Sequence, residues 1–303
     1  MSLPSVAVVI PTRGRPLQLA RCLRQVVPYV SLYHECRIFV TDDGNAEETR
    51  AVIEQEFPGV VVVQGPRRGP AANRNWGAGQ SKVDLLIFMD DDCIPESSVI
   101  AEFQSAAVKH PHCGVFEGRI SPIGKSDSFG EYCPANEDGG HLWSCNLAIR
   151  QDLFASIGGF DERYPFPAME DADLRVRVEA NSPILFIPEA RVFHGYEKRP
   201  GMKIMRHNAL SLLLFAHLHG LQSTGRSPSY FLRASARLLV FDGARILRRR
   251  ATGDLKQMIF MLWVYAKLLI ITMLWRFRGV LAKRLFPACC QSCQSLHANL
   301  GRD

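Results

Sequence analysis

The sequence LLIFMDDDCIP, residues 85–95, passes abruptly from five apolar residues to three consecutive carboxylates, Asp90, Asp91 and Asp92. A short, continuous apolar run of this kind is typical of a strand that is buried on both faces. Three adjacent negative charges repel one another unless a positive group lies beside them. The stretch therefore predicts a buried strand that ends at a site for a cation.

The first 110 residues repeat this organisation. Apolar runs typical of strands occupy 6–10, 37–40, 60–64 and 85–89, and helical patterns lie between them at 16–27, 46–57 and 70–78. Strands and helices in alternation predict an α/β fold with a mostly parallel, doubly wound sheet. Three of the strands end in polar clusters, PTRGR, TDDGN and MDDD. Because such sheets bind ligands beyond the carboxyl ends of their strands, we expect the clusters to face one crevice.

The middle of the chain is less regular, and its end is helical. Strands are predicted at 113–120, 142–150 and 183–194, a helix at 170–180, and further helices at 202–220, 229–250 and 256–278. We therefore expect one large domain over 1–200, with halves 1–110 and 111–200, and a helical region over 201–303.

The net charge of +6 is distributed unevenly along the 303 residues. Residues 1–195 contain 18 Lys and Arg against 26 Asp and Glu, whereas residues 196–303 contain 18 against 4. The balances are −8 and +14, so the basic region favours an anionic partner such as lipid headgroups or nucleic acid.

Residues 258–275 form an apolar run of 18 residues that Lys267 interrupts and that basic residues flank on both sides. A central lysine costs roughly 2.5–3.5 kcal/mol in a spanning helix. A helix lying in the plane of an anionic membrane therefore fits best. A membrane span and burial against the rest of the chain or a dimer partner remain open alternatives.

The nine cysteines and the N-terminus bear on the compartment. MSLPSVAVVI contains no basic segment before its apolar residues, so we expect no signal peptide and reduced, cytosolic thiols. Cys289, Cys290 and Cys293, with His297, resemble a zinc cluster only loosely, because no second Cys-x-x-Cys pair follows. Tail thiols or lipidation are equally open.

The carboxylates after residue 89 are the donors that Mg²⁺ and Mn²⁺ prefer, and these ions often bridge protein carboxylates to phosphates. We therefore expect a divalent cation there. The alternative is a solvated turn in which Asp92 caps a helix that starts near Pro95.

Together, VVIPTRGRP, FVTDDGN, RRGPAANRNWGA, FMDDDCIP and GGFDERYPFPAMEDADLRVR resemble the ordered motifs of glycosyltransferase family 2 over roughly residues 5–195. This resemblance implies a glycosyltransferase-A catalytic domain over 1–200, with a nucleotide-binding half and an acceptor half, and a D-x-D motif at residues 90–92. It also implies inverting transfer with a metal ion.

The resemblance implies a nucleotide-sugar site made of Pro11, Thr12, Arg13, Asp43, Arg74, Asp90 and Asp91. In that site, Asp43 accepts a hydrogen bond from the donor base, and Arg74 lies near the diphosphate or holds the acids in place. Asp90 contacts the ribose or, through water, the metal, which Asp92 binds directly. The alternatives are that Arg13 and Arg74 are surface charges and that Asp42 only shapes its turn.

The resemblance assigns the acceptor chemistry to the MEDADLR segment. Asp171 is the implied base, Glu170 positions the acceptor, His194 is a second metal ligand and Trp143 lies near the sugar. Inverting transfer needs a base for the acceptor hydroxyl and a positive charge at the leaving diphosphate. The alternatives are an acidic first turn that satisfies a helix N-terminus, a structural histidine and a core tryptophan.

These observations predict an enzyme that moves a sugar from a nucleotide-sugar donor to a hydroxyl of a glycan or lipid-linked acceptor in cell-surface polysaccharide synthesis. We expect a UDP-sugar as the donor, and dTDP-rhamnose is the alternative donor. We expect Mn²⁺ or Mg²⁺, no nucleic acid, and a cytoplasmic protein peripheral on the inner face of the membrane; a homodimer is left open.

Three rival interpretations remain at this stage. A dinucleotide-dependent oxidoreductase is disfavoured because PTRGRP follows the first strand in place of G-x-G-x-x-G. A protein that binds nucleic acid or another anionic surface through its basic end would leave the acidic crevice unexplained. A non-catalytic relative that only binds nucleotide-sugars is disfavoured by Asp92, Asp171 and His194.

Overall fold

The computed structural model describes residues 3–30, 36–126, 131–198 and 202–219, together with scattered positions between 233 and 270. The chain divides into two compact units. One contains residues 1–127 and 131–199, and the other contains residues 128–130 and 200–303. All the predicted site residues belong to the first unit.

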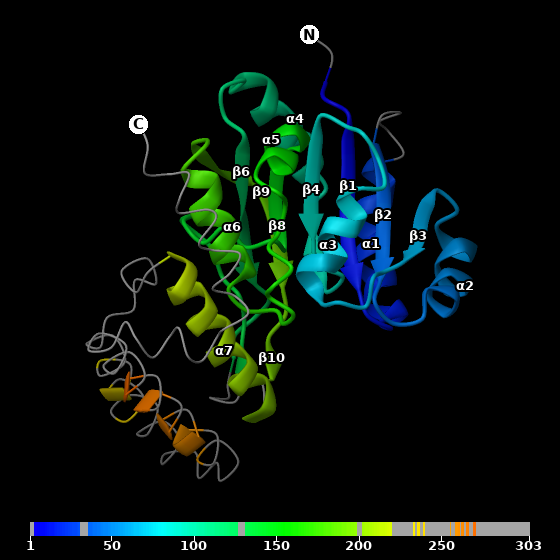
Figure 1. Ribbon diagram of the computed structural model, residues 1–303. Coiled ribbons are helices and arrows are strands. Elements are labelled where there is room, and N and C mark those ends of the chain that lie inside the picture. The colour runs from blue at the N-terminus through cyan, green and yellow to red at the C-terminus, as the bar shows by residue number, and fades with distance from the viewer. Residues whose placement is uncertain are drawn as a thin grey trace. The chain divides into compact units, whose positions relative to one another are not determined.

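Four parallel strands form one side of the main sheet, in the order β3-β2-β1-β4 (Figure 1). They are β1 (Val6–Thr12), β2 (Cys36–Asp42), β3 (Val60–Gln64) and β4 (Leu85–Met89), and the helices between them are α1 (Pro16–Val30), α2 (Ala46–Glu56) and α3 (Pro70–Ala78). The predicted alternation of strands and helices is therefore confirmed in this half.

The sheet continues beyond β4 to a total of eight strands, in the order β4-β8-β6-β9-β5. These strands are β5 (Cys93–Pro95), β6 (Val115–Pro122), β8 (Asn146–Arg150) and β9 (Ile184–His194). β8 runs antiparallel to both of its neighbours, β6 and β9 are parallel, and β5 is antiparallel to β9. The predicted mixed, mostly parallel α/β sheet is confirmed. Separately, β7 (Glu131–Tyr132) pairs with β10 (Glu197–Lys198).

Helices cover both faces of this sheet, which explains the continuous apolar runs. In β1, Val6, Val8 and Ile10 join one apolar cluster, whereas Ala7 and Val9 join the other. The first cluster includes residues of α1, α2 and α4 (Val99–Lys109), and the second includes residues of α3, α5 (Gln151–Ser156) and α6 (Glu170–Glu179). Every residue of β1 and β4 is therefore buried.

The structure corrects two local predictions. Residues 93–95 form a strand, and the following helix begins at Val99, so Asp92 does not cap a helix near Pro95. The predicted strand over 142–150 begins only at Asn146. The backbone N–H groups of Gly140, His141 and Leu142 donate to the carboxylate of Glu117, and this holds the chain before Asn146 in a loop.

Only α7 (Met202–His219) of the predicted C-terminal helices is described along its full length. Most of the predicted helices over 229–250 and 256–278, and the group Cys289, Cys290 and Cys293, lie outside the described residues. Within the part of the chain that the structure covers, no helix combines the length and the apolarity of a membrane span.

Candidate active site

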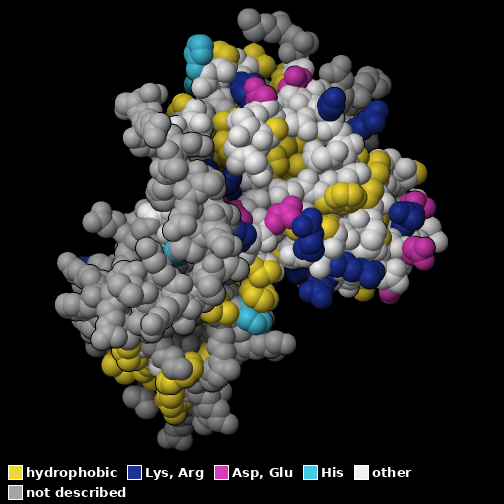
Figure 2. Space-filling model, viewed as in Figure 1, with side chains coloured by type: hydrophobic (Ala, Val, Ile, Leu, Met, Phe, Trp, Pro, Cys, Tyr) yellow, Lys and Arg dark blue, Asp and Glu magenta, His cyan; other side chains and the backbone are white. Residues whose placement is uncertain are grey.

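A cleft of about 540 Å³ lies beyond the carboxyl ends of the parallel strands. Its lining contains six residues of the predicted nucleotide-sugar site, namely Pro11, Thr12, Arg13, Asp43, Arg74 and Asp90. The lining also includes residues that were not predicted as site residues, namely Arg15, Arg67, Arg68 and the segment 165–167. Figure 2 shows basic side chains gathered over the carboxyl ends of β1–β3. The cleft therefore offers positive charge to an anionic ligand.

The two aspartates at the end of β2, Asp42 in the strand and Asp43 after it, stabilise the loops around the cleft. The carboxylate of Asp42 is buried and accepts hydrogen bonds from the N–H groups of Gly14 and Gly44 and from the Thr49 hydroxyl. This geometry favours the interpretation that Asp42 shapes its turn. Asp43 accepts hydrogen bonds from the N–H groups of Arg67 (2.8 Å) and Gly69 (3.2 Å), so it fixes the loop between β3 and α3.

Arg74 is a buried arginine that joins the two halves of the unit. Its guanidinium lies 2.8 Å from Asp90 and 3.5 Å from Glu170, atom to atom. Burial alone lowers the pKa of Arg74, but the charges of Asp90, Asp171 and Glu170 outweigh it and raise that pKa. Arg74 therefore stays charged and holds the acids in place, which is one of the two roles that the resemblance implied.

Asp91 lies behind the cleft. Its side chain is fully buried, accepts a hydrogen bond of 2.5 Å from the Thr12 hydroxyl, and pairs with the Arg15 guanidinium at 2.5 Å. Burial raises the pKa of Asp91 to about 7, against the opposing effect of Arg15. The carboxylate does not line the cleft, so its position differs from the donor contact that the resemblance implied. It positions Thr12 and Arg15, which do line it.

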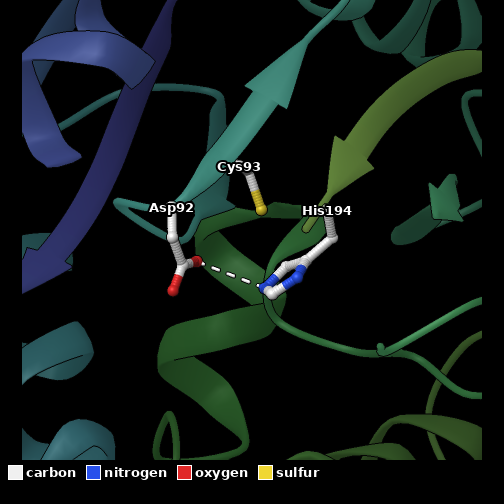
Figure 3. A group of neighbouring side chains, drawn as sticks. All are labelled: Asp92, Cys93 and His194. Carbon is white, nitrogen blue, oxygen red and sulfur yellow. Dashed lines mark ion pairs between the residues drawn. The ribbon is translucent and has the colours of Figure 1, made fainter. Parts of the chain in front are cut away.

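Asp92, Cys93 and His194 converge beside the cleft (Figure 3). The Oδ1 atom of Asp92 lies 3.3 Å from Nε2 of His194. Nδ1 of His194 lies 2.7 Å from the carbonyl oxygen of Gly195, and a proton on Nδ1 can be donated to that oxygen. This contact orients the imidazole so that Nε2 faces Asp92. A second contact, of 3.3 Å, joins Asp92 to Arg15.

Asp92 and His194 each stabilise the charged form of the other. Burial alone raises the pKa of Asp92, but the hydrogen bond with His194 and the charges of His194 and Arg15 lower it to about 2. Burial lowers the pKa of His194, and the contacts with Asp92 and Gly195 outweigh this effect and raise it to about 9. The pair is therefore ionised near neutral pH.

The donor set fits a divalent cation. Oδ1 of Asp92 is covered and faces Nε2 of His194 at 3.3 Å, and Gly195 holds the imidazole in place. Burial and the charge of Asp92 also raise the pKa of nearby Glu197. A cation would relieve this excess of negative charge. Asp92 and His194 would hold it, while Asp90 faces the cleft with Arg74.

Glu170 and Asp171 open α6 on the other side of Arg74. Burial, together with the neighbouring charge of Asp171, raises the pKa of Glu170 to about 8. Oδ2 of Asp171 accepts a hydrogen bond of 3.2 Å from the backbone N–H of Ser144. Its Oδ1 accepts no hydrogen bond from the described residues, and burial raises the pKa of this carboxyl. Asp171 is therefore fixed through one oxygen and retains the other for a proton.

Trp143 precedes the residue that holds Asp171. Its indole is half-buried, packs against the apolar core and stacks on His141 at 4.7 Å. The ring thus has the packing contacts of a core tryptophan next to the position that the resemblance assigned to the acceptor.

Four additional residues could have been selected from their neighbourhood in the sequence. Arg15 lies in the same PTRGR cluster as Arg13, and Arg67 and Arg68 immediately precede the Gly69-Pro70 start of α3. Cys93 follows the carboxylates directly, but only the pairing of β5 with β9 brings it opposite His194.

Comparisons with known proteins identify similar chains. Residues 7–152 match the family model of glycosyl transferase family 2. An uncharacterized glycosyltransferase of Haemophilus influenzae is 24% identical over 81% of this chain and 87% of its own length. The O-antigen biosynthesis protein RfbC of Myxococcus xanthus is 25% identical over 63% of this chain, which spans only 17% of that protein.

Two further matches are a curated relative and a solved structure. The N-acetylglucosaminyl-diphospho-decaprenol L-rhamnosyltransferase of Mycobacterium tuberculosis is 32% identical over 39% of this chain and 40% of its own length. A solved mannosyltransferase of Pyrobaculum calidifontis, in complex with GDP-Man and Mn²⁺, has a TM-score of 0.56. That likeness covers 92% of this chain and 89% of the mannosyltransferase at 15% identity, and it shows the fold.

Proposed function

Because this chain belongs, by the match over residues 7–152, to glycosyl transferase family 2 and has the glycosyltransferase-A fold, we propose that it is a metal-dependent, inverting transferase. It moves a hexosyl or rhamnosyl group from a nucleotide-sugar to a hydroxyl of a glycan or lipid-linked acceptor. The observation that carries this proposal is that three groups lie together at one edge of the sheet. These are the basic cleft, the Asp92–His194 pair and Oδ1 of Asp171, which accepts no hydrogen bond from the residues that the structure describes.

Asp171 is the proposed base. As the acceptor oxygen forms its bond to the anomeric carbon, the bond from that carbon to the diphosphate breaks, and the acceptor proton passes to Oδ1 of Asp171. The Ser144 N–H holds Oδ2 and so fixes the direction of the carboxylate. Because burial raises the pKa of Asp171, its ionised form is a stronger base than an exposed aspartate. Glu170, adjacent to it and paired with Arg74, is the proposed acceptor-positioning residue.

The donor occupies the cleft in this proposal. Arg13 and Arg74 lie among the residues that line it, beside the carboxylates of Asp43 and Asp90. Asp92 and His194 hold the Mn²⁺ or Mg²⁺ ion. When bound, such an ion supplies positive charge to the diphosphate that departs. The mannosyltransferase that shares this fold was solved with GDP-Man and Mn²⁺, which supports a nucleotide-sugar and a divalent ion.

The acceptor is proposed from relatives. One is named as a rhamnosyltransferase acting on a diphospho-decaprenol, and another as a glucosyltransferase acting on a PP-undecaprenol. Together with the +14 balance of residues 196–303, these names support a lipid-linked acceptor and an enzyme that associates with an anionic membrane at its cytoplasmic face. UDP-sugars and dTDP-rhamnose are the donors to test first.

Calorimetric titration of the protein with UDP, dTDP and GDP, in Mn²⁺ and then in EDTA, tests the proposal. We expect one nucleotide to bind with metal and to bind much more weakly in EDTA or to the Asp92→Ala variant. Asp152→Ala, an exposed change on α5 outside the cleft, is the matched control and should bind like the wild type. If no nucleotide binds in the presence of Mn²⁺, this assignment of the cleft is overturned.

A further inference from the structure

Cys93 belongs to the same group of ligand atoms as Asp92 and His194. In the antiparallel pairing of β5 with β9, Cys93 lies directly opposite His194. Residues opposite each other in such a pair project their side chains to the same face of the sheet. One ligand atom from each of the three residues, including Sγ of Cys93, lies within 4.8 Å of the other two. Figure 3 shows the three side chains converging on one space.

The backbone ladder fixes this arrangement. The third side chain, Asp92, precedes Cys93 by one residue, and the Gly195 carbonyl orients the imidazole so that Nε2 faces Asp92. Sγ of Cys93 lies 3.7 Å from the carbonyl oxygen of Cys145 and also contacts the Cys145 thiol, and both are weak partners that a metal ion can displace. The thiol is buried, whereas the Asp92 side chain is 16% exposed and provides a route for an ion.

The three donors differ in hardness. A carboxylate and an imidazole suit Mn²⁺, and Mg²⁺ prefers oxygen, but neither of these ions gains much from a thiolate. Zn²⁺ is bound in proteins by this combination of sulfur, imidazole nitrogen and carboxylate oxygen, and three protein ligands leave its fourth position open. The presence of Cys93 therefore changes which metals this centre favours.

We propose that Asp92, Cys93 and His194 form a site for a soft divalent ion of the Zn²⁺ class, in which the Cys93 thiolate is the third ligand. The Cys93 thiol releases its proton to solvent as the Zn–S bond forms, and no group is oxidised or reduced. The ion competes with Mn²⁺ for Asp92 and His194. Zn²⁺ is thus an antagonist of the hard ion that the proposed function assigns to the same pair.

Near-ultraviolet and visible absorption of the full-length protein with Co²⁺, a spectroscopic substitute for Zn²⁺, tests the site without nucleotide, sugar or turnover. We expect sulfur-to-Co²⁺ charge-transfer absorption in the wild type. The difference between wild type and Cys93→Ser isolates this thiolate from the other cysteines. Cys113→Ser, another buried cysteine outside the metal group, is the matched control and should retain the full signal.

Calorimetry then separates loss of a ligand from loss of the fold. In Cys93→Ser we expect the Zn²⁺ affinity to fall by at least the roughly 10-fold to 100-fold that is lost when only an outer-shell partner of a metal ligand is removed. The Mn²⁺ affinity should stay within about twofold, which also reports an intact Asp92–His194 pair; Cys93→Ala serves if the serine variant does not fold. Equal charge-transfer absorption in wild type and Cys93→Ser, or equal losses of Zn²⁺ and Mn²⁺ affinity, would overturn the proposal. Because no measurement uses a nucleotide, failure of the transferase assignment would appear separately.

Discussion

Three consecutive aspartates have three different environments in this protein. Asp90 faces the cleft and pairs with Arg74, Asp91 is buried against Thr12 and Arg15, and Asp92 points at His194. Their different directions follow from a turn after β4, which the hydrogen bond from the Cys93 N–H to the Asp90 carbonyl oxygen closes, so that successive side chains leave the backbone in different directions. The sequence predicted a cation site here, but the direction of each side chain depends on partners that are distant in the chain.

At the residue scale, Asp171→Asn should abolish most turnover. The amide is nearly isosteric and keeps an oxygen for the Ser144 N–H, but it cannot accept the acceptor proton. We expect kcat to fall by about 10²–10⁴, the usual contribution of a general base. Nucleotide affinity should be unchanged by calorimetry. Asp152→Asn is the control on an exposed helix, and wild-type turnover in Asp171→Asn would exclude Asp171 as the base.

A second prediction at this scale concerns pH. His194 has a pKa raised to about 9, so its imidazole must release a proton before it can bind a metal ion. Asp92, with a pKa lowered to about 2, stays ionised throughout. The Mn²⁺ affinity should therefore rise by about tenfold per pH unit below pH 9 and then level off, because one proton leaves for each ion bound. Calorimetry in several buffers measures both quantities. A flat profile in the wild type, or the same slope in His194→Ala, would contradict this role.

The helices and strands position the cleft as much as individual side chains do. α3 begins at Pro70, directly after Gly69, whose φ of 100° and ψ of 175° belong to a region open almost only to glycine. A β-carbon on Gly69 would also meet the backbone carbonyl of Pro165, which lines the cleft. The entry to α3 thus depends on one residue without a side chain.

Gly69→Ala should cost about 1–3 kcal/mol of unfolding free energy, the usual range for a strained backbone position. It should also weaken nucleotide binding, because the Gly69 N–H donates to Asp43. Gly79→Ala, at the other end of the same helix with φ of −78°, is the matched control and should change stability little. Urea unfolding and nucleotide titration of the two variants test this prediction. Equal stability losses would show that the conformation of Gly69 is not the cause.

Elements whose apolar pattern decides their structure locally were predictable from the sequence, as the bounds of β3, α3 and β4 show. The start of β8 was not, because the loop before it is held by Glu117, a residue more than 20 positions earlier. The pairing of Cys93 with His194 likewise spans about 100 residues. The family resemblance predicted Asp92 and His194 as site residues, but it did not predict Cys93 or Arg15.

At the scale of the whole molecule, the charge balances of −8 for residues 1–195 and +14 for residues 196–303 predict that the basic part binds an anionic membrane. The full-length protein should bind vesicles that contain anionic lipid, and binding should weaken with salt as the Debye length shortens from about 10 Å at 0.1 M. Replacing the basic run 248–250 with alanines should reduce binding. The same charge change at Arg21, Arg37 and Lys82, in the acidic part, is the control. Equal binding to zwitterionic vesicles would refute an electrostatic mechanism.

Arg74 has a consequence for the order of events. One guanidinium serves as counter-ion for Asp90 on the donor side and for Glu170 on the acceptor side. An anionic donor that draws this charge toward itself leaves Glu170 less neutralised, and this makes its carboxyl easier to protonate. By thermodynamic reciprocity, protonation of Glu170 frees Arg74 for the donor. The two substrate sites are thus linked through a shared charge, and donor affinity should depend on the proton occupancy of a residue that the donor never contacts.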